Sequence, residues 1–227
     1  MAEKVYSINA PYPGLTRERQ QEELNMEKNS AKKSTMSTTR QMTGMAMMTA
    51  IVIVLQLLGS LIRFGPFSIS LVLVPIVVGA ALYGVWAGGW LGFVFGVVVL
   101  ISGDAAAFLA VNIPATIALC IVKGTLCGLC AGIVHKLMDN KDTVKDDLFA
   151  AAAAAFVCPV VNTGVFLLFC SMFFLDTISA WGVAAGFKNT VAYMFLGLAG
   201  ANFLVELITD SVLTPMIVRL IHVAEKK

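Results

Sequence analysis

Residues 69–96 read ISLVLVPIVVGAALYGVWAGGWLGFVFG and contain no Asp, Glu, Lys or Arg. They lie within a longer run without charged residues, from Phe64 to Gly103. A helix that crosses a membrane needs about 20 apolar residues, so this run is long enough for two such helices. The segment GVWAGG at residues 84–89 is typical of a turn and supplies the break between them. The stretch therefore predicts a membrane protein built from several helices.

The rest of the chain has the same character. Hydrophobic residues make up 58% of the sequence and charged residues only 13%, far from the balance of soluble domains. Charged residues are also absent from residues 41–62, 105–122 and 148–175. We expect six spans, near residues 42–62, 69–86, 88–103, 112–136, 148–174 and 190–219. The predicted fold is an all-α membrane protein, a bundle of six transmembrane helices over residues 41–222.

The placement of Lys and Arg predicts the orientation of this bundle. Most of them fall in the polar segment 1–40, in the loop between the fourth and fifth spans, and near the C-terminus. Arg63 and Lys188 fall in loops on the opposite side. Because cytoplasmic segments are enriched in Lys and Arg, both termini are expected in the cytoplasm. Residues 1–40 are then a flexible cytoplasmic tail and residues 223–227 a short one.

The sequence contains no common signature of catalysis or nucleotide binding: no HExxH, no GxSxG and no Walker lysine loop. Cys127 and Cys130 form a single CxxC pair inside an apolar span, where cysteines behave as small hydrophobic residues. His135 and His222 fall at cytoplasmic span ends and are interpreted as interfacial anchors. We therefore predict no catalytic residue, no metal site, no cofactor and no nucleic-acid partner.

Polar residues inside the spans are more informative, because a Lys or Asp at the membrane centre costs about 2.5–3.5 kcal/mol. They are Asn112, Thr116 and Lys123 in the fourth span, Asn162 and Thr163 in the fifth, and Asn202, Glu206, Thr209 and Asp210 in the sixth. Within the fourth and sixth spans they fall on one helix face. Three polar faces favour a cavity, although hydrogen bonds that only join helices are the alternative. Lys123 and Glu206 have similar depths and are predicted to form a buried ion pair, with Asp210 as a substitute partner.

Several segments carry a family resemblance. They are AMMTA at residues 46–50, the stretch 69–96, KGTLCGLCAGI at 123–133, VNTGVFLL at 161–168 and NFLVELITDSVLTPMI at 202–217. Their order and spacing resemble the substrate-binding S components of energy-coupling factor (ECF) vitamin transporters, in the group with pantothenate- and folate-type members. The resemblance covers about residues 42–222.

The resemblance implies a division of labour. Such a subunit binds a vitamin or related micronutrient outside a prokaryotic cell, in the plasma membrane. A separate membrane scaffold, the T component, and two cytoplasmic ATPase subunits drive the import. In this family an AxxxA pattern on the first helix is a docking surface for the scaffold, and Ala46 and Ala50 occupy that pattern. Small residues four apart let another backbone come close, so packing inside the same bundle is the alternative.

A substrate pocket is expected in the outer halves of the spans, because binding sites combine apolar walls with a few polar groups. The candidate lining residues are Asn112, Thr116, Asn162, Thr163 and Asn202, with Tyr193 as a stacking surface. Arg63 and Lys188 at the mouth predict a ligand with a carboxylate or similar anion, unless they are interfacial anchors. A stand-alone secondary carrier or channel and an intramembrane enzyme remain alternative functions.

Overall fold

The computed structural model describes residues 39–61, 63–64, 67–68, 71–139 and 144–225. The chain divides into two units, Met1–Gly44 and Met45–Lys227. In the first unit, residues 39–44 are described and begin a helix. The predicted tail 1–40 therefore lies outside the described residues apart from Thr39 and Arg40, which are helical. Everything below concerns the second unit unless stated.

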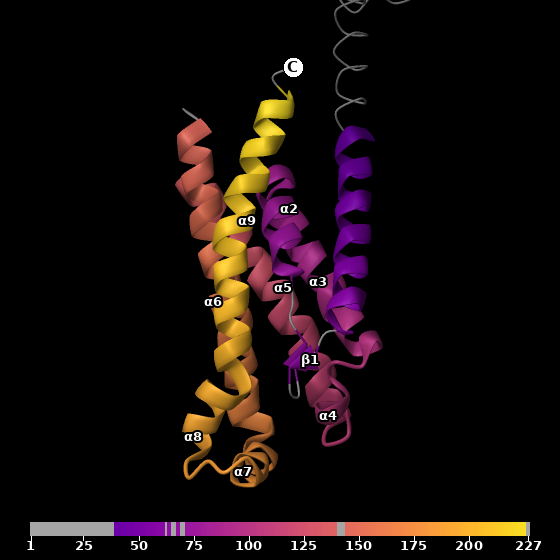
Figure 1. Ribbon diagram of the computed structural model, residues 1–227. Helices are drawn as coiled ribbons and strands as arrows, with labels where there is room; N and C mark the ends of the chain where they lie inside the picture. The colour runs from indigo at the N-terminus through magenta and orange to yellow at the C-terminus, as the bar shows by residue number, and fades with distance from the viewer. Residues whose placement is uncertain (1–38, 62, 65–66, 69–70, 140–143, 226–227) are drawn as a thin grey trace, which may run out of the picture. The chain divides into compact units, whose positions relative to one another are not determined.

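Helices account for nearly all of the described residues (Figure 1). In chain order the elements are the N-terminal helix Thr39–Gly59, β1 (Arg63–Phe64), β2 (Phe67–Ser68), α2 (Leu73–Tyr83), α3 (Val85–Ser102), α4 (Ala106–Leu109), α5 (Ile113–Met138), α6 (Val144–Phe173), α7 (Leu175–Ala184), α8 (Thr190–Ala192), the π-helix η1 (Tyr193–Gly200) and α9 (Ala201–Glu225). The two short strands form an antiparallel hairpin, with Phe64 opposite Phe67.

Within the part of the chain that the structure describes, four helices are long and apolar enough to cross a membrane: Thr39–Gly59, Val85–Ser102, Ile113–Met138 and Asp146–Phe173. Residues Thr190–Gly200 and Asn202–Arg219 add a fifth crossing if this pair, bent by 40°, counts as one span. The protein is therefore an integral, multi-pass membrane protein. The second predicted span, 69–86, corresponds to α2, which has 11 residues and falls short of the criterion in length. The count of six stays a prediction.

Two breaks differ from the sequence prediction. The expected turn at residues 84–89 is confined to Gly84, whose φ of 93° is the left-handed conformation that glycine adopts readily. Residues 85–89 already belong to α3, so this helix begins three residues before the predicted residue 88. It ends at Ser102, because Gly103 has φ 83° and reverses the backbone.

The helices pack around glycine-rich contacts. Gly88, Gly92 and Gly96 on α3 face the backbone of α5 at Gly128, Gly124 and Cys120, and a Cβ atom added at any of the three glycines would overlap these carbonyl groups. Small residues let two helix backbones approach closely in a membrane, where the hydrophobic effect between helices is weak. Helix α5 packs on α6 through its other side, and α6 packs on α9.

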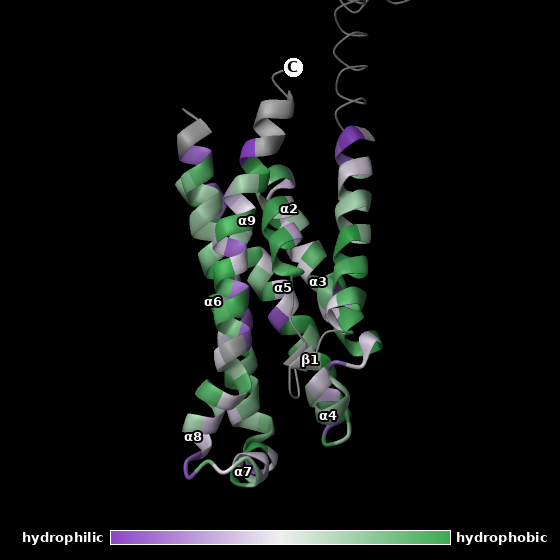
Figure 2. Cartoon of the chain, in the orientation of Figure 1, coloured by the Kyte–Doolittle hydropathy of each residue, from purple (hydrophilic) through white to green (hydrophobic). Residues whose placement is uncertain are grey.

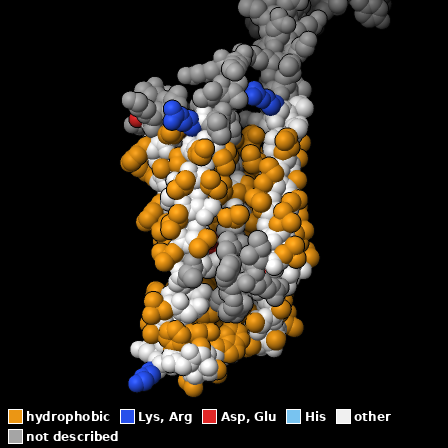
Figure 3. Space-filling view, in the orientation of Figure 1, with side chains coloured by type: hydrophobic (Ala, Val, Ile, Leu, Met, Phe, Trp, Pro, Cys, Tyr) orange, Lys and Arg blue, Asp and Glu red, His pale blue; other side chains and the backbone are white. Residues whose placement is uncertain are grey.

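The short helix α2 lies inside this arrangement and contacts α3, α5, α6 and α9. Eight of its eleven residues, Leu73 to Ala80, are buried. Its apolar sequence therefore packs against protein. By contrast, many large apolar side chains of the longer helices are exposed, among them Trp86, Phe195 and Leu204. Figure 3 shows hydrophobic side chains over the sides of the helices in this view, and Figure 2 shows that these helices consist mostly of hydrophobic residues, as expected for contact with lipid.

Candidate functional site

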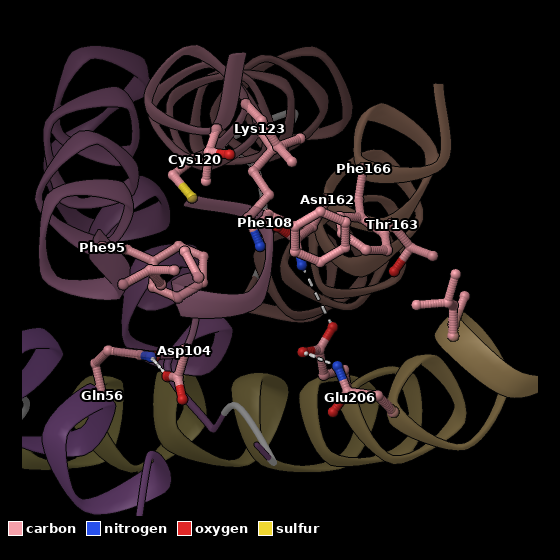
Figure 4. A pocket seen from close by; sticks show the side chains of 17 residues that line it. Gln56, Phe95, Asp104, Phe108, Cys120, Lys123, Asn162, Thr163, Phe166 and Glu206 are labelled. Atoms are coloured by element: carbon pink, nitrogen blue, oxygen red, sulfur yellow. Dashed lines mark hydrogen bonds between the residues drawn. The ribbon is translucent and has the colours of Figure 1, made fainter. Parts of the chain in front are cut away.

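A cavity lies among the N-terminal helix, α3, the segment around α4, α5, α6, η1 and α9 (Figure 4). It encloses about 770 Å³ of atom-free space, part of which is open to the surroundings. Its lining consists of Gln56, Phe95, Val99, Asp104, Ala105, Phe108, Thr116, Leu119, Cys120, Lys123, Asn162, Thr163, Phe166, Leu198, Ala199, Asn202 and Glu206. Eight of these seventeen residues are polar or charged, and the others form apolar walls, so the cavity combines the two kinds of surface that a small-molecule site uses.

Helix α5 presents one face to this cavity. The helix begins at Asn112, whose side-chain oxygen accepts a hydrogen bond from the Ala115 backbone N–H at 3.1 Å, and Pro114 occupies its first turn. From this fixed start, Thr116 and Lys123 fall two helical turns apart on the same face. Thr116 is fully buried, and its hydroxyl donates to the Asn112 carbonyl at 2.7 Å.

The ammonium group of Lys123 projects into the cavity between aromatic rings. Its Nζ lies 5.4 Å from the centre of the Phe95 ring and 5.8 Å from that of Phe166. A cation over an aromatic face is attracted by the ring quadrupole, more strongly where water is excluded. These contacts stabilise the charge without using the three N–H donors of the ammonium group.

Glu206 projects into the same cavity from α9. Its carboxylate accepts hydrogen bonds from the side-chain amides of Asn202, at 2.9 Å, and Asn162, at 3.4 Å. Only 2% of the surface of Glu206 is exposed. Because Asn162 belongs to α6, this network joins α6 to α9 and holds the carboxylate in a defined position. Charge-assisted hydrogen bonds of this kind are stronger than neutral ones.

A second carboxylate reaches the cavity from the connection between α3 and α4. Asp104 Oδ2 accepts a hydrogen bond from the Gln56 side-chain amide at 2.6 Å and one from the Ser102 hydroxyl at 3.1 Å. Gln56 is 2% exposed and lies in the N-terminal helix, so this contact joins that helix to the cavity wall.

Aromatic side chains close the cavity at the end formed by α4 and α7. The ring of Phe108 makes edge-to-face contacts with Phe166, Phe174 and Trp181, with ring centres 5.8, 5.1 and 5.4 Å apart. Such geometry is the preferred one for aromatic pairs. Phe108 and Phe166 of this cluster line the cavity, and Phe174 and Trp181 support them from outside the lining.

The structure brings together six of the residues singled out in the sequence: Thr116, Lys123, Asn162, Thr163, Asn202 and Glu206. Three others do not line the cavity: Asn112 caps α5, Tyr193 packs on Phe187, and Lys188 is exposed between α7 and α8. The side chain of Arg63 lies outside the described residues.

The sequence prediction missed Gln56, Asp104 and the three phenylalanines of the lining. Gln56 is the one strongly polar residue in the interior of the first apolar run, so the sequence did contain a signal from which it could have been predicted. Asp104 is the single charged residue between two runs without charge, so it too could have been predicted as a functional residue. The phenylalanines gave none, because aromatic residues are equally common on lipid-facing surfaces.

Lys123 and Glu206 line the same cavity, but no ion pair within 4.0 Å joins them among the described residues. Their pairing therefore stays a prediction. Asp210, the substitute partner, is 1% exposed and lies outside the lining. Its Oδ2 atom has no hydrogen-bond partner among the described residues.

Ala46 and Ala50 are both exposed on the N-terminal helix. The opposite side of this helix packs on the core through Met45, Met48 and Val52. Among the described residues, neither alanine packs against another helix of the bundle closely enough to be buried. A surface that presents small side chains outward is available to another helix or to lipid.

A model of the family "ECF transporter, substrate-specific component" matches residues 40–218. The chain belongs to this family. As an ECF substrate-specific component, it is a membrane subunit that binds a transported molecule, in a family of transport subunits rather than of enzymes. No curated protein was found to match the chain.

Proposed function

We propose that this ECF substrate-specific component captures a vitamin or related micronutrient in the cavity around Lys123 and Glu206. The T component and two ATPase subunits of an ECF importer then drive its uptake across the prokaryotic plasma membrane. The observation that carries this proposal is the cavity itself, in which charged groups from α5, α9 and the connection between α3 and α4 converge within apolar walls. In a lipid-embedded protein such groups are expensive to bury and mark functional sites.

The arrangement favours a ligand with an anionic group and a flat apolar part. Lys123 keeps its N–H donors directed into the cavity, where a carboxylate or phosphate would accept them. The rings of Phe95, Phe108 and Phe166 offer faces and edges to an aromatic or heterocyclic moiety. Glu206, held by two amides, would accept a hydrogen bond from the opposite end of such a ligand.

This proposal shifts the anion-binding role from Lys188 to Lys123. Thr116, Thr163, Asn162 and Asn202 keep their proposed place in the binding site, because all four line the cavity. The remaining proposed residues, Asn112 and Tyr193, would act indirectly, by capping α5 and by packing at the start of η1. Arg63, in β1, keeps its proposed role near the mouth.

The proposed topology has six spans, with both termini in the cytoplasm. Helix α2 would be the additional crossing, second in chain order. At about 1.5 Å per residue it is shorter than the hydrocarbon core, but surrounding helices bury it and would shield the adjoining non-helical backbone from lipid. The cytoplasmic side would then be the end at which α5 ends and α6 begins.

The proposed docking surface for the T component is the outward face of the N-terminal helix at Ala46 and Ala50. Both are exposed, and Met42, Met47 and Val54 of the same helix are exposed as well. Two helices can approach most closely where one presents small residues at this spacing.

A reconstitution experiment tests the partnership. Proteoliposomes containing this chain with the T component and ATPases should accumulate the ligand only when ATP is present inside. Proteoliposomes containing the chain alone should bind ligand without accumulating it. Accumulation by the chain alone would instead indicate the alternative function of a secondary carrier or channel, and chemical turnover of the ligand would indicate an enzyme.

A further inference from the structure

A cluster of three potential metal ligands lies away from the cavity, where α5 ends and α6 begins. His135 belongs to the last turn of α5, Asp139 is the residue that caps this helix, and Asp147 belongs to the first turn of α6. One ligand atom from each residue lies within 4.8 Å of the other two. The Asp139 backbone N–H donates to the His135 carbonyl at 2.9 Å, which fixes these two residues one turn apart.

The imidazole of His135 is buried beside one of these carboxylates. Its side chain is 6% exposed, and Nε2 lies 3.1 Å from Asp147 Oδ1. The approach does not meet the geometry of a hydrogen bond, and Nε2 has no other partner among the described residues. Ligand atoms bound to one ion at about 2.0–2.2 Å lie roughly 3 Å from each other, so this separation suits two ligands of one cation.

The chemistry of the three groups selects the kind of ion. Two carboxylates match the charge of a divalent cation, and a neutral imidazole nitrogen favours a transition metal over Mg²⁺ or Ca²⁺, which prefer oxygen ligands only. Asp139 and Asp147 have further interactions within the protein. A carboxylate has two oxygens with about four lone-pair directions, so it can bind an ion and keep another partner.

We propose that His135, Asp139 and Asp147 bind a divalent transition-metal cation such as Zn²⁺, with water as the remaining ligand. The ion would clamp the C-terminal end of α5 to the first turn of α6. In the proposed topology this end faces the cytoplasm, so the ion would come from the cytoplasmic pool and would not compete with the transported ligand.

The test is isothermal titration calorimetry of the full-length chain in detergent, with ZnCl₂ and, in parallel, MgCl₂. The affinity tag must not be polyhistidine. We expect one equivalent of Zn²⁺ to bind with no comparable Mg²⁺ binding, and Zn²⁺ to raise the melting temperature. His135→Ala and Asp147→Asn should each weaken Zn²⁺ binding by at least about tenfold.

Asp146→Asn is the matched control, because Asp146 neighbours Asp147 on α6 but is not one of the three ligands. It should bind Zn²⁺ like the parent. If His135→Ala does not fold, Asp139→Asn provides the same test at a partly exposed position. No Zn²⁺ binding by the parent, equal binding by the ligand variants, or loss of binding in Cys130→Ser would each overturn the proposal.

Discussion

Lys123 places a positive charge within the apolar bundle, with its Nζ over the rings of Phe95 and Phe166. A lysine in such a position is costly, and an adjacent acid commonly compensates it. Here the carboxylates of Glu206 and Asp104 lie in the same cavity but accept hydrogen bonds from amides. The lysine is therefore available to a ligand.

The first prediction concerns the binding of an anionic ligand by the ammonium group of Lys123. Lys123→Met preserves much of the side-chain volume and removes the charge, so affinity for an anionic ligand should fall at least tenfold, or about 1.4 kcal/mol. Calorimetric titration of the purified protein measures it. Lys188→Met is the control, because Lys188 is exposed outside the cavity and should bind normally. Equal affinities of parent and Lys123→Met would remove Lys123 from the site.

The second prediction concerns the predicted pair of Lys123 and Glu206. Two charges in one cavity interact even when they do not touch. Their substitutions then have non-additive effects on the free energy of unfolding, commonly by about 0.5–3 kcal/mol for neighbouring groups. Lys123→Met should lower the melting temperature, and addition of Glu206→Gln should recover part of that loss. A thermal-unfolding double-mutant cycle measures the coupling. Strictly additive effects of the two substitutions would mean that the charges do not interact.

Sequence periodicity was sufficient to find the polar residues of α5 and α9, because residues on one helix face recur every three or four positions. Thr116 and Lys123 were found in this way, and so were Asn202 and Glu206. Tyr193 was predicted separately, as a stacking surface for the ligand, and its ring packs on Phe187. Nothing in the sequence distinguishes a tyrosine that stacks on a ligand from one that stacks on its own chain.

At the scale of elements, the contact of α3 with α5 depends on glycine. The backbones touch along three turns, so an added methyl group has no space at Gly92 or Gly124. The sequence predicted both helices, but it could not show that their glycines face each other. That depends on how the two helices are rotated about their axes, which no charge or turn signal specifies.

The third prediction follows from this contact. Gly92→Ala should destabilise the protein by about 1–3 kcal/mol, since overpacking forces the helices apart. Gly164→Ala on α6 is the matched control, because a Cβ atom there meets nothing within 4 Å. Thermal unfolding in detergent compares the two. Should Gly92→Ala melt with or above Gly164→Ala, the close approach of α3 and α5 is incorrect.

The fourth prediction concerns the N-terminal helix. Ala46→Leu combined with Ala50→Leu should leave ligand binding unchanged, because both side chains point away from the core. Co-purification with the T component should fall strongly, because added volume prevents close helix contact. Met47→Leu, at an exposed position between them, is the control. Normal assembly of the double variant would mean that this face contacts lipid.

At the scale of the whole molecule, hydropathy predicted the positions of the spans, because burial of a helical backbone in lipid is a strong constraint. It did not predict how the crossings differ. Helix α2 is short and enclosed, and the last crossing bends by 40° between Thr190–Gly200 and Asn202–Arg219. The short length of α2 and the bend both depend on packing against neighbouring helices. The hydropathy of a segment does not show how it packs.

The whole molecule is proposed to capture its ligand in the cavity and to leave the work of transport to partner subunits. Capture requires that the purified chain hold a small molecule without any other subunit. The ammonium group of Lys123 on α5 and the carboxylate of Glu206 on α9 both project into the cavity (Figure 4). These two charged groups then determine whether that molecule stays bound.

Native mass spectrometry of the detergent-purified chain, with its Lys123→Met variant beside it, tests this claim most directly. The account predicts that the parent carries one non-covalently bound small molecule with an anionic group. It also predicts that the Lys123→Met variant, shown to be folded at the temperature of the measurement by its cooperative thermal unfolding, carries much less of it. A parent that binds nothing even after growth in rich medium, or a variant that retains the same molecule equally well, would contradict the account.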